Sequence, residues 1–192
     1  MTAPIRRRTR AREIAMQVLF QFDLRGPGYA AELGVTLREL CAEASEGQTD
    51  VLEFATRLVE GTLAHREEID QKLQSVTRNW DLRRMANVDR NVLRMAMHEL
   101  MFCHDVPPKV AINEAIELGK KFSTANSGGF VNGILDRIRI DIERERLLQG
   151  QAPKKQGQTA PQAQQEQALQ SQALEGQAAA RGEPAAADGL GA

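Results

Sequence analysis

Apolar residues recur at the spacing of an α-helix along most of the first 148 residues. The clearest run follows the basic start of the chain and occupies positions i, i+3, i+4, i+7, i+8 and i+11: Ala11, Ile14, Ala15, Val18, Leu19 and Phe22. Such a stripe lies on one face of a helix and can pack against a core. No segment alternates apolar and polar residues as a half-buried strand would. The spacing therefore predicts an all-α fold.

Six further segments have the same spacing: 33–41, 50–62, 69–76, 89–103, 110–122 and 131–142. Asp50 and Asp89 are plausible N-caps, Pro107 and Pro108 are expected to end the fifth helix, and residues 123–129 are expected to form a loop. These signals predict a compact bundle of about seven helices, arranged as two three-helix lobes.

The composition changes at residue 149. Residues 149–192 contain no Val, Ile, Phe, Tyr or Trp and are dominated by Gln and Ala. A segment of this kind cannot bury enough apolar surface to offset the entropy lost on ordering. We therefore predict a helical domain over residues 1–148 and a disordered tail over 149–192.

Several classes of protein are disfavoured by what the sequence lacks. No apolar run reaches the roughly 20 residues of a membrane span, and two cysteines, Cys41 and Cys103, favour a reducing compartment such as the cytoplasm. No catalytic, nucleotide-binding or metal-binding motif occurs. His65, His98 and His104 are interpreted as ordinary surface or boundary residues. We expect a cytoplasmic protein that is not an enzyme and has no metal or cofactor.

The positive charge is concentrated at the start of the chain, although the formal net charge is only −1. Five arginines precede the first acidic residue, Glu13: Arg6, Arg7, Arg8, Arg10 and Arg12. A basic run of this density is typical of phosphate-binding segments, but it also occurs at solvated termini. The charge pattern alone leaves both interpretations open.

Met16 and Phe20 lie four residues apart on the side of the first helix opposite the apolar stripe. Exposed apolar residues in pairs indicate a surface for a partner protein or for a second copy of the chain. A second structural element could equally cover them, and the spacing does not decide between these alternatives.

Four strings carry a resemblance to a known family. The chain begins with R-R-R-T-R-A-R-E-I-A-M-Q-V-L-F (6–20) and continues with V-D-R-N-V-L-R-M-A-M-H-E-L (88–100). The strings V-P-P-K-V-A-I-N-E-A-I-E-L-G-K-K-F (106–122) and F-V-N-G-I-L-D (130–136) follow. In this order and spacing, together with R-N-W at 78–80, they closely resemble the bacterial transcription antitermination factor NusB family.

The resemblance implies an all-helical protein that joins a small-subunit ribosomal protein, NusE, and holds boxA RNA. This complex would help RNA polymerase to read through terminators in ribosomal RNA operons. The implied RNA-binding residues are Arg6, Arg7, Arg8, Arg10, Arg12, Lys120, Lys121, Phe122, Asn126 and Asn132. The implied partner-binding residues are Met16, Phe20 and Asp89.

Two positions depart from the family pattern. Position 20 is Phe where many relatives have Tyr, so a hydroxyl is lost. Position 126 is Asn where an acidic residue is common, and the missing negative charge should favour phosphate nearby.

Three other interpretations assign the chain a different role. A helical adaptor that binds only proteins would keep the arginines as a solvated terminus. The related domain at the front of some ribosomal RNA methyltransferases is disfavoured because nothing after residue 148 reads as a folded enzyme. A transit peptide is disfavoured by the early acidic residues Glu13 and Asp23.

Overall fold

The computed structural model describes residues 3–42, 48–77 and 81–148 of the 192-residue chain. These residues form seven α-helices and two short 3-10 helices, and none of them is in a strand. The helices are α1 (Ala3–Arg25), η1 (Pro27–Glu32), α2 (Leu33–Ala42), α3 (Gln48–Ala64), α4 (Arg66–Val76), η2 (Leu82–Arg84), α5 (Asn87–Phe102), α6 (Pro108–Phe122) and α7 (Ser127–Leu148). The predicted all-α fold is confirmed, whereas the predicted disordered tail lies outside the described residues.

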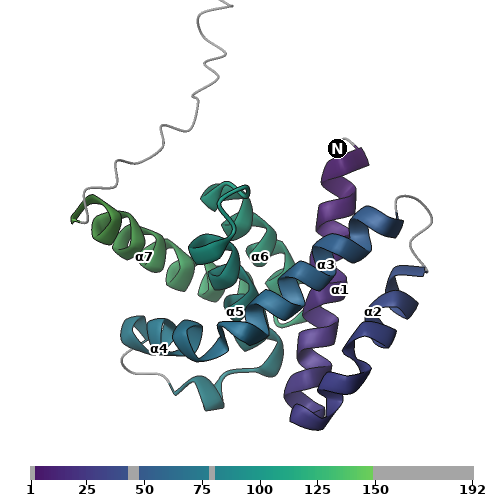
Figure 1. Ribbon diagram of the computed structural model, residues 1–192. Helices are drawn as coiled ribbons and strands as arrows, with labels where there is room; N and C mark the ends of the chain where they lie inside the picture. Colours follow the sequence, from purple (N-terminus) through teal and green to yellow (C-terminus); the bar gives the residue numbers. More distant parts are fainter. Residues whose placement is uncertain (1–2, 43–47, 78–80, 149–192) are drawn as a thin grey trace, which may run out of the picture. The chain divides into compact units, whose positions relative to one another are not determined.

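The helices form two groups that share one core (Figure 1). Helices α1, α2 and α3 pack against one another, and α5, α6 and α7 form the second group. Helix α5 also contacts α1 and α3, while α4 lies against α5 and α7. Every residue from Asn91 to Leu100 is buried, so α5 is the central helix of the bundle. The two predicted three-helix groups are therefore present, joined through α5.

Several predicted helix boundaries were displaced by a few residues. Helix α3 begins at Gln48, so Asp50 lies in its first turn, where a carboxylate still interacts favourably with the helix dipole. Helix α5 has Ala86 at its N-cap, so Asp89 is not the cap. Pro108 begins α6 rather than ending α5, because the first turn of a helix needs no donor from that residue. Helix α7 begins at Ser127, which shortens the predicted loop.

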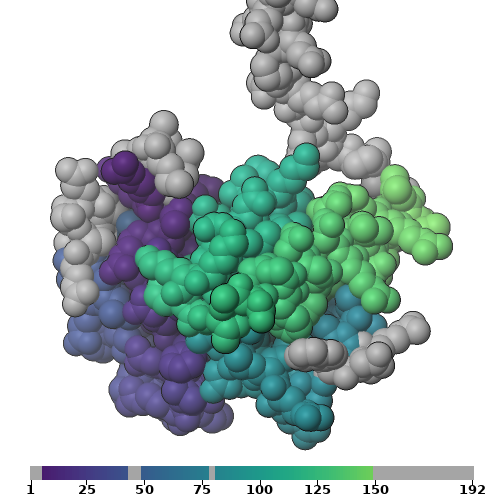
Figure 2. Space-filling view, turned by 180° about the vertical axis from the view of Figure 1, so that it is seen from behind, coloured from purple at the N-terminus to yellow at the C-terminus, as the bar shows by residue number. Residues whose placement is uncertain are grey.

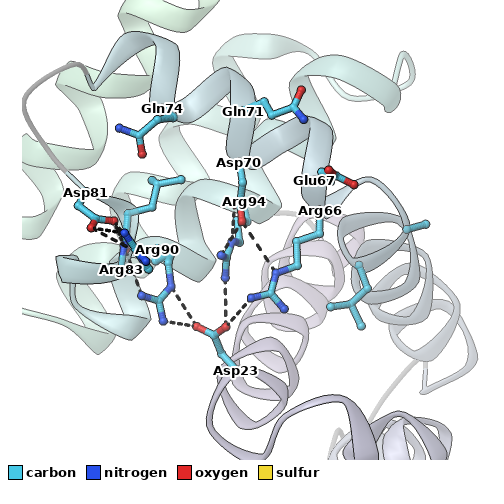
Figure 3. A pocket seen from close by; sticks show the side chains of 13 residues that line it. Asp23, Arg66, Glu67, Asp70, Gln71, Gln74, Asp81, Arg83, Arg90 and Arg94 are labelled. Carbon is cyan, nitrogen blue, oxygen red and sulfur yellow. Dashed lines mark hydrogen bonds and ion pairs between the residues drawn. The ribbon is translucent and has the colours of Figure 1, made fainter.

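A network of charges around the buried Asp23 holds the end of α1 against α4 and α5 (Figure 3). The Asp23 side chain is only 6% exposed. It accepts hydrogen bonds from Arg90 Nε at 3.0 Å, Arg94 Nη1 at 3.2 Å and Arg66 Nη2 at 3.1 Å, and Arg94 also donates to Asp70. Burial raises the pKa of Asp23, but the hydrogen bond from Arg90 and the neighbouring arginine charges outweigh it and leave the pKa below its usual value.

His98 is a buried residue of α5, so the prediction of a surface or boundary position was wrong. Its ring stacks with His65 and Phe102, each with ring centroids 5.6 Å away. Gly61 makes this possible, because a Cβ atom there would come within 2.3 Å of the His98 ring. Burial, reinforced by the charges of His65 and Arg57, lowers the pKa of His98 to about 4. His98 is therefore neutral at pH 7.

No helix in the described part of the chain combines the length and apolar character that crossing a bilayer requires.

Candidate nucleic-acid interface

The first half of α1 presents arginines at the surface. Arg6 and Arg8 are exposed, and Arg7 and Arg10 are partly exposed. Arg7 Nη1 donates to Asp50 Oδ2 at 2.8 Å and Arg10 Nη1 to Glu13 Oε2 at 3.2 Å. The Arg7 and Arg10 side chains nevertheless keep 35% and 38% of their surface open to solvent. These arginines are available to an approaching anion, because exposed ion pairs are weak and exchange readily.

Arg12 does not belong to this surface, which corrects its predicted role as an RNA contact. Its side chain is 2% exposed and donates to Glu99 through Nη2 at 2.7 Å and Nε at 3.0 Å. Glu114 lies 3.5 Å from Nη1. A charge this deeply buried requires a counter-charge inside the protein. Arg12 therefore joins α1 to α5 and α6.

The end of α6 lies beside the basic half of α1 (Figure 2). Lys121 Nζ donates to Glu13 Oε1 at 2.5 Å, and Thr9 donates to Glu114 at 3.2 Å. The structure thus brings Lys121 next to Arg10, which also pairs with Glu13. Two groups of predicted RNA-binding residues, more than 100 positions apart in the sequence, form one edge.

The remaining predicted RNA-binding residues lie on α6, on α7 and in the turn between them. Lys120 and Glu117 are both exposed and pair with each other at 2.7 Å. Lys121 Nζ lies 5.2 Å from the centre of the Phe122 ring, and that ring is partly buried against the core. Asn126 and Asn132 are both exposed. Phe122 thus offers a supported ring beside a cation.

Gly128 allows α7 to begin close to α6. A Cβ atom at this position would come within 2.8 Å of Lys120 Cγ. The stem of Lys120 therefore packs over the start of α7, and its ammonium group pairs with the exposed Glu117 of α6.

The residues predicted to bind a partner protein are less exposed than expected. Met16 is 2% exposed and belongs to the core, because α1 is flanked by α2 and α3 on one side and by α5 and α6 on the other. Phe20 is partly buried against the same core. For Met16, the alternative that other helices cover this face is the correct one. Self-association through an exposed Met16 is therefore no longer supported.

Asp89 is also mostly buried, with 8% of its surface exposed. Its Oδ2 atom accepts a hydrogen bond from the Ser127 hydroxyl at 3.1 Å. Its Oδ1 atom is buried and has no hydrogen-bond partner among the residues that the structure describes. In this structure Asp89 links α5 to the first residue of α7.

Arg57 of α3 also belongs to this region, although it was not among the predicted RNA-binding residues. Its guanidinium lies 5.9 Å from the centre of the Phe54 ring, which Arg8 also approaches at 5.0 Å. Arg57 stands three residues after Phe54 and so lies on the same side of α3. This spacing was the only local signal, because the approach to Arg8 depends on how α3 packs against α1.

An open cleft of about 1010 Å³ lies between α1, α4 and α5 around the Asp23 network (Figure 3). Its charges balance, because four arginines and four carboxylates line it: Arg66, Arg83, Arg90 and Arg94 with Asp23, Glu67, Asp70 and Asp81. Within the described ranges no group of three or more His, Cys, Asp or Glu side chains could hold a metal ion. The cationic edge formed by α1 and α6 is the stronger candidate site.

The fold and this edge define a small all-helical protein with a cationic edge. The NusB family pattern matches residues 9–139, and the chain belongs to the NusB family. The transcription antitermination protein NusB of Anaeromyxobacter sp. (strain Fw109-5) is 47% identical over 140 residues, which cover 73% of this chain and 94% of that protein.

Solved structures agree with this assignment. T. maritima NusB has a TM-score of 0.62 and 40% identity, covering 70% of this chain and 91% of its own. A crystal structure of the antitermination factors NusB and NusE in complex with dsRNA contains a chain with a TM-score of 0.62 and 32% identity. That match covers 71% of this chain and 98% of the other.

Proposed function

We propose that the protein is a transcription antitermination factor that binds boxA-type single-stranded RNA together with the small-subunit ribosomal protein NusE. The observation that carries this proposal is the edge on which Arg7, Arg8 and Arg10 meet Lys121 while remaining partly open to solvent. Membership in the NusB family supports it. The protein acts by binding alone and makes or breaks no covalent bond.

RNA would lie along this edge with its phosphates towards the basic side chains. Guanidinium and ammonium groups bind phosphate oxygens, and a base can stack on the ring of Phe122 or on an arginine plane. Few rings are available, so the electrostatic contribution dominates. The affinity of the chain alone should therefore be modest and should fall steeply with salt.

A partner protein would complete the RNA-binding surface. A related NusB has been solved together with NusE and RNA, which supports the same association here. Phe20 of α1 is only partly buried, so a partner protein could still contact it. The complex should bind RNA more tightly and selectively than this chain does, because one RNA then contacts two proteins at once.

Fluorescence anisotropy of a labelled boxA-type RNA tests the proposal. The chain is titrated alone and with purified NusE, against a scrambled RNA of equal length. We expect tighter and more selective binding with NusE. Equal affinity with and without NusE would overturn the cooperative part of the proposal. If neither RNA binds, the proposed function is wrong and the alternative, a helical adaptor that binds only proteins, is favoured.

Transcription in vitro tests the cellular role. A template with a boxA leader and a downstream terminator, taken from a ribosomal RNA operon, is transcribed with RNA polymerase and the other antitermination proteins. Adding this protein should increase read-through, and mutating boxA should remove the increase. Unchanged read-through would contradict the role in antitermination.

A further inference from the structure

Three guanidinium groups surround the ring of Phe54, which is 8% exposed. The distances from each Cζ to the ring centre are 5.0 Å for Arg8, 5.2 Å for Arg12 and 5.9 Å for Arg57. Arg12 is neutralised by the buried carboxylate of Glu99. The charges of Arg8 and Arg57 are therefore the two that face outward over this ring.

A single carboxylate serves both of these arginines. Arg57 Nη1 donates to Asp105 Oδ2 at 3.1 Å and its Nη2 donates to Oδ1, while Arg8 Nη2 lies 3.7 Å from Oδ2. The hydrogen bond between them raises the pKa of Arg57 and lowers that of Asp105, so both are charged at neutral pH. Two positive charges thus share one negative charge.

All three side chains are open to water. Arg8, Arg57 and Asp105 expose 50%, 42% and 44% of their side-chain surface. They come from α1, from α3 and from the turn between α5 and α6. An anion can reach them without any rearrangement of the core.

The position of Arg57 extends the basic edge across α3. Arg7 pairs with Asp50 in the first turn of α3, and Arg57 lies two turns further along that helix. The guanidinium groups of Arg8 and Arg57 both lie over the Phe54 ring, and this cation–π contact limits their freedom. Restricted guanidinium groups lose less entropy when they bind a phosphate bidentately.

We propose that Arg8 and Arg57 form a phosphate-binding subsite for RNA on the Phe54 ring, and that Asp105 is an internal competitor which the phosphate displaces. This inference rests on the proposed RNA-binding function and adds to it a binding position on α3. Asp105 competes with any anion and therefore weakens binding. An anion that contacts both arginines, such as a phosphodiester, displaces Asp105 more readily than one that contacts a single arginine, so the competition adds selectivity.

Two substitutions of opposite effect test the subsite, using labelled boxA-type RNA and the full chain with saturating NusE. Arg57→Gln should weaken RNA binding by about five- to tenfold and reduce the slope of log K against log salt by about 0.7. Asp105→Asn removes the competing charge and keeps the side-chain shape, so it should tighten binding by about threefold.

The other end of α1 supplies matched controls. Arg25 lies 4.2 Å from the centre of the Tyr29 ring and pairs with Glu32 at 2.8 Å, with both side chains about half exposed. This arrangement repeats the one at Arg57, but it is about 25 Å further along α1 than Arg8, beyond the range of screened charge interactions. Arg25→Gln and Glu32→Gln should leave RNA affinity within about twofold of wild type.

The outcomes separate this inference from the function on which it rests. Wild-type protein that fails to bind RNA overturns the proposed function. Wild-type protein that binds RNA, with Arg57→Gln and Asp105→Asn binding equally well, overturns only the subsite. A lower melting temperature for Arg57→Gln with unchanged RNA affinity and salt slope would show that the Arg57–Asp105 pair merely joins α3 to the turn after α5.

Discussion

Arg8 and Arg12 lie one turn apart on the same side of α1, and both guanidinium groups approach the ring of Phe54. Arg8 is half exposed and faces Asp105 at the rim of the bundle, whereas Arg12 is 2% exposed and bonded to Glu99. Identical side chains one turn apart therefore have different roles. The depth at which each meets the neighbouring helices decides which of them holds the fold and which can bind a ligand.

The energetic reason is desolvation. An exposed arginine keeps most of its hydration, so its ion pair contributes between about 0 and 1 kcal/mol and can be exchanged for a phosphate. A buried arginine has lost its water, and removing its partner leaves an uncompensated charge that costs about 3–5 kcal/mol. Substitutions should consequently affect stability in the buried region and RNA binding at the exposed edge.

The largest expected effect is on stability. Arg12→Ala leaves Glu99 buried without its partner and should reduce the free energy of unfolding by about 3–5 kcal/mol, as measured by urea denaturation. Arg8→Ala is the matched control and should cost about 1 kcal/mol or less. The double variant Arg12→Met, Glu99→Leu should recover much of the loss. Equal losses for Arg8→Ala and Arg12→Ala would remove the distinction between the two sites.

His98 extends the comparison to a buried basic residue that is bonded to no carboxylate among the residues that the structure describes. Its pKa of about 4 in the folded chain is below its ordinary value of 6.5, so between these values the unfolded chain takes up the proton. This contribution to stability is complete above pH 6.5 and is lost as the pH falls towards 4. Between pH 7 and pH 5 the loss should be about 2 kcal/mol.

Urea denaturation from pH 5 to pH 7.5 measures this effect. His98→Gln should be less stable at pH 7.5 but should flatten the dependence on pH. His104→Gln alters an exposed histidine and should retain the wild-type profile. A His98→Gln profile as steep as that of wild type would assign the pH dependence to other groups.

The exposed half of α1 should show the opposite pattern. Arg7→Ala combined with Arg8→Ala should weaken binding of boxA-type RNA by about tenfold or more and should lower the salt slope by about 0.7 for each phosphate that is no longer neutralised. The free energy of unfolding should change by only about 1 kcal/mol. An RNA titration at several salt concentrations, with circular dichroism of the same samples, checks both. Strong destabilisation would show that Arg7 and Arg8, like Arg12, serve mainly to hold the fold together.

The smallest effect is expected at Asn126. Asn126→Asp places a negative charge beside the proposed RNA path and just before the first residue of α7. RNA affinity should fall by about threefold, whereas thermal stability should rise slightly because a carboxylate favours a helix N-terminus. Asn132→Asp is the matched substitution within α7 and should give no such gain in stability. Unchanged RNA affinity for Asn126→Asp would show that RNA does not pass close to the turn between α6 and α7.

Much of the fold follows from local spacing. The apolar stripes predicted all seven α-helices, because the period of a helix is imposed by neighbouring residues along the chain. Two helices are longer than their stripes: α1 begins at Ala3, ahead of the stripe that starts at Ala11, and α7 continues to Leu148, past the segment that ends at residue 142. Boundaries shifted at Pro108, which begins α6 instead of ending α5, and at Asp50, which lies in the first turn of α3 instead of at its N-cap. The arginine run located positive charge at the start of the chain, where Arg7, Arg8 and Arg10 lie on α1, but it did not decide between a phosphate-binding segment and a solvated terminus.

The interactions that individual side chains make inside the bundle could not be predicted from local spacing. Arg12 differs from its neighbours through its buried contacts with Glu99 and Glu114, which lie 87 and 102 positions away, and Met16 is buried only because other helices cover the second side of α1. Arg57 joined the basic edge through Asp105, 48 positions later. Helical periodicity is a short-range property that a linear pattern contains. Burial and charge pairing depend on which distant segments come into contact, and those contacts are determined by the packing of the whole bundle.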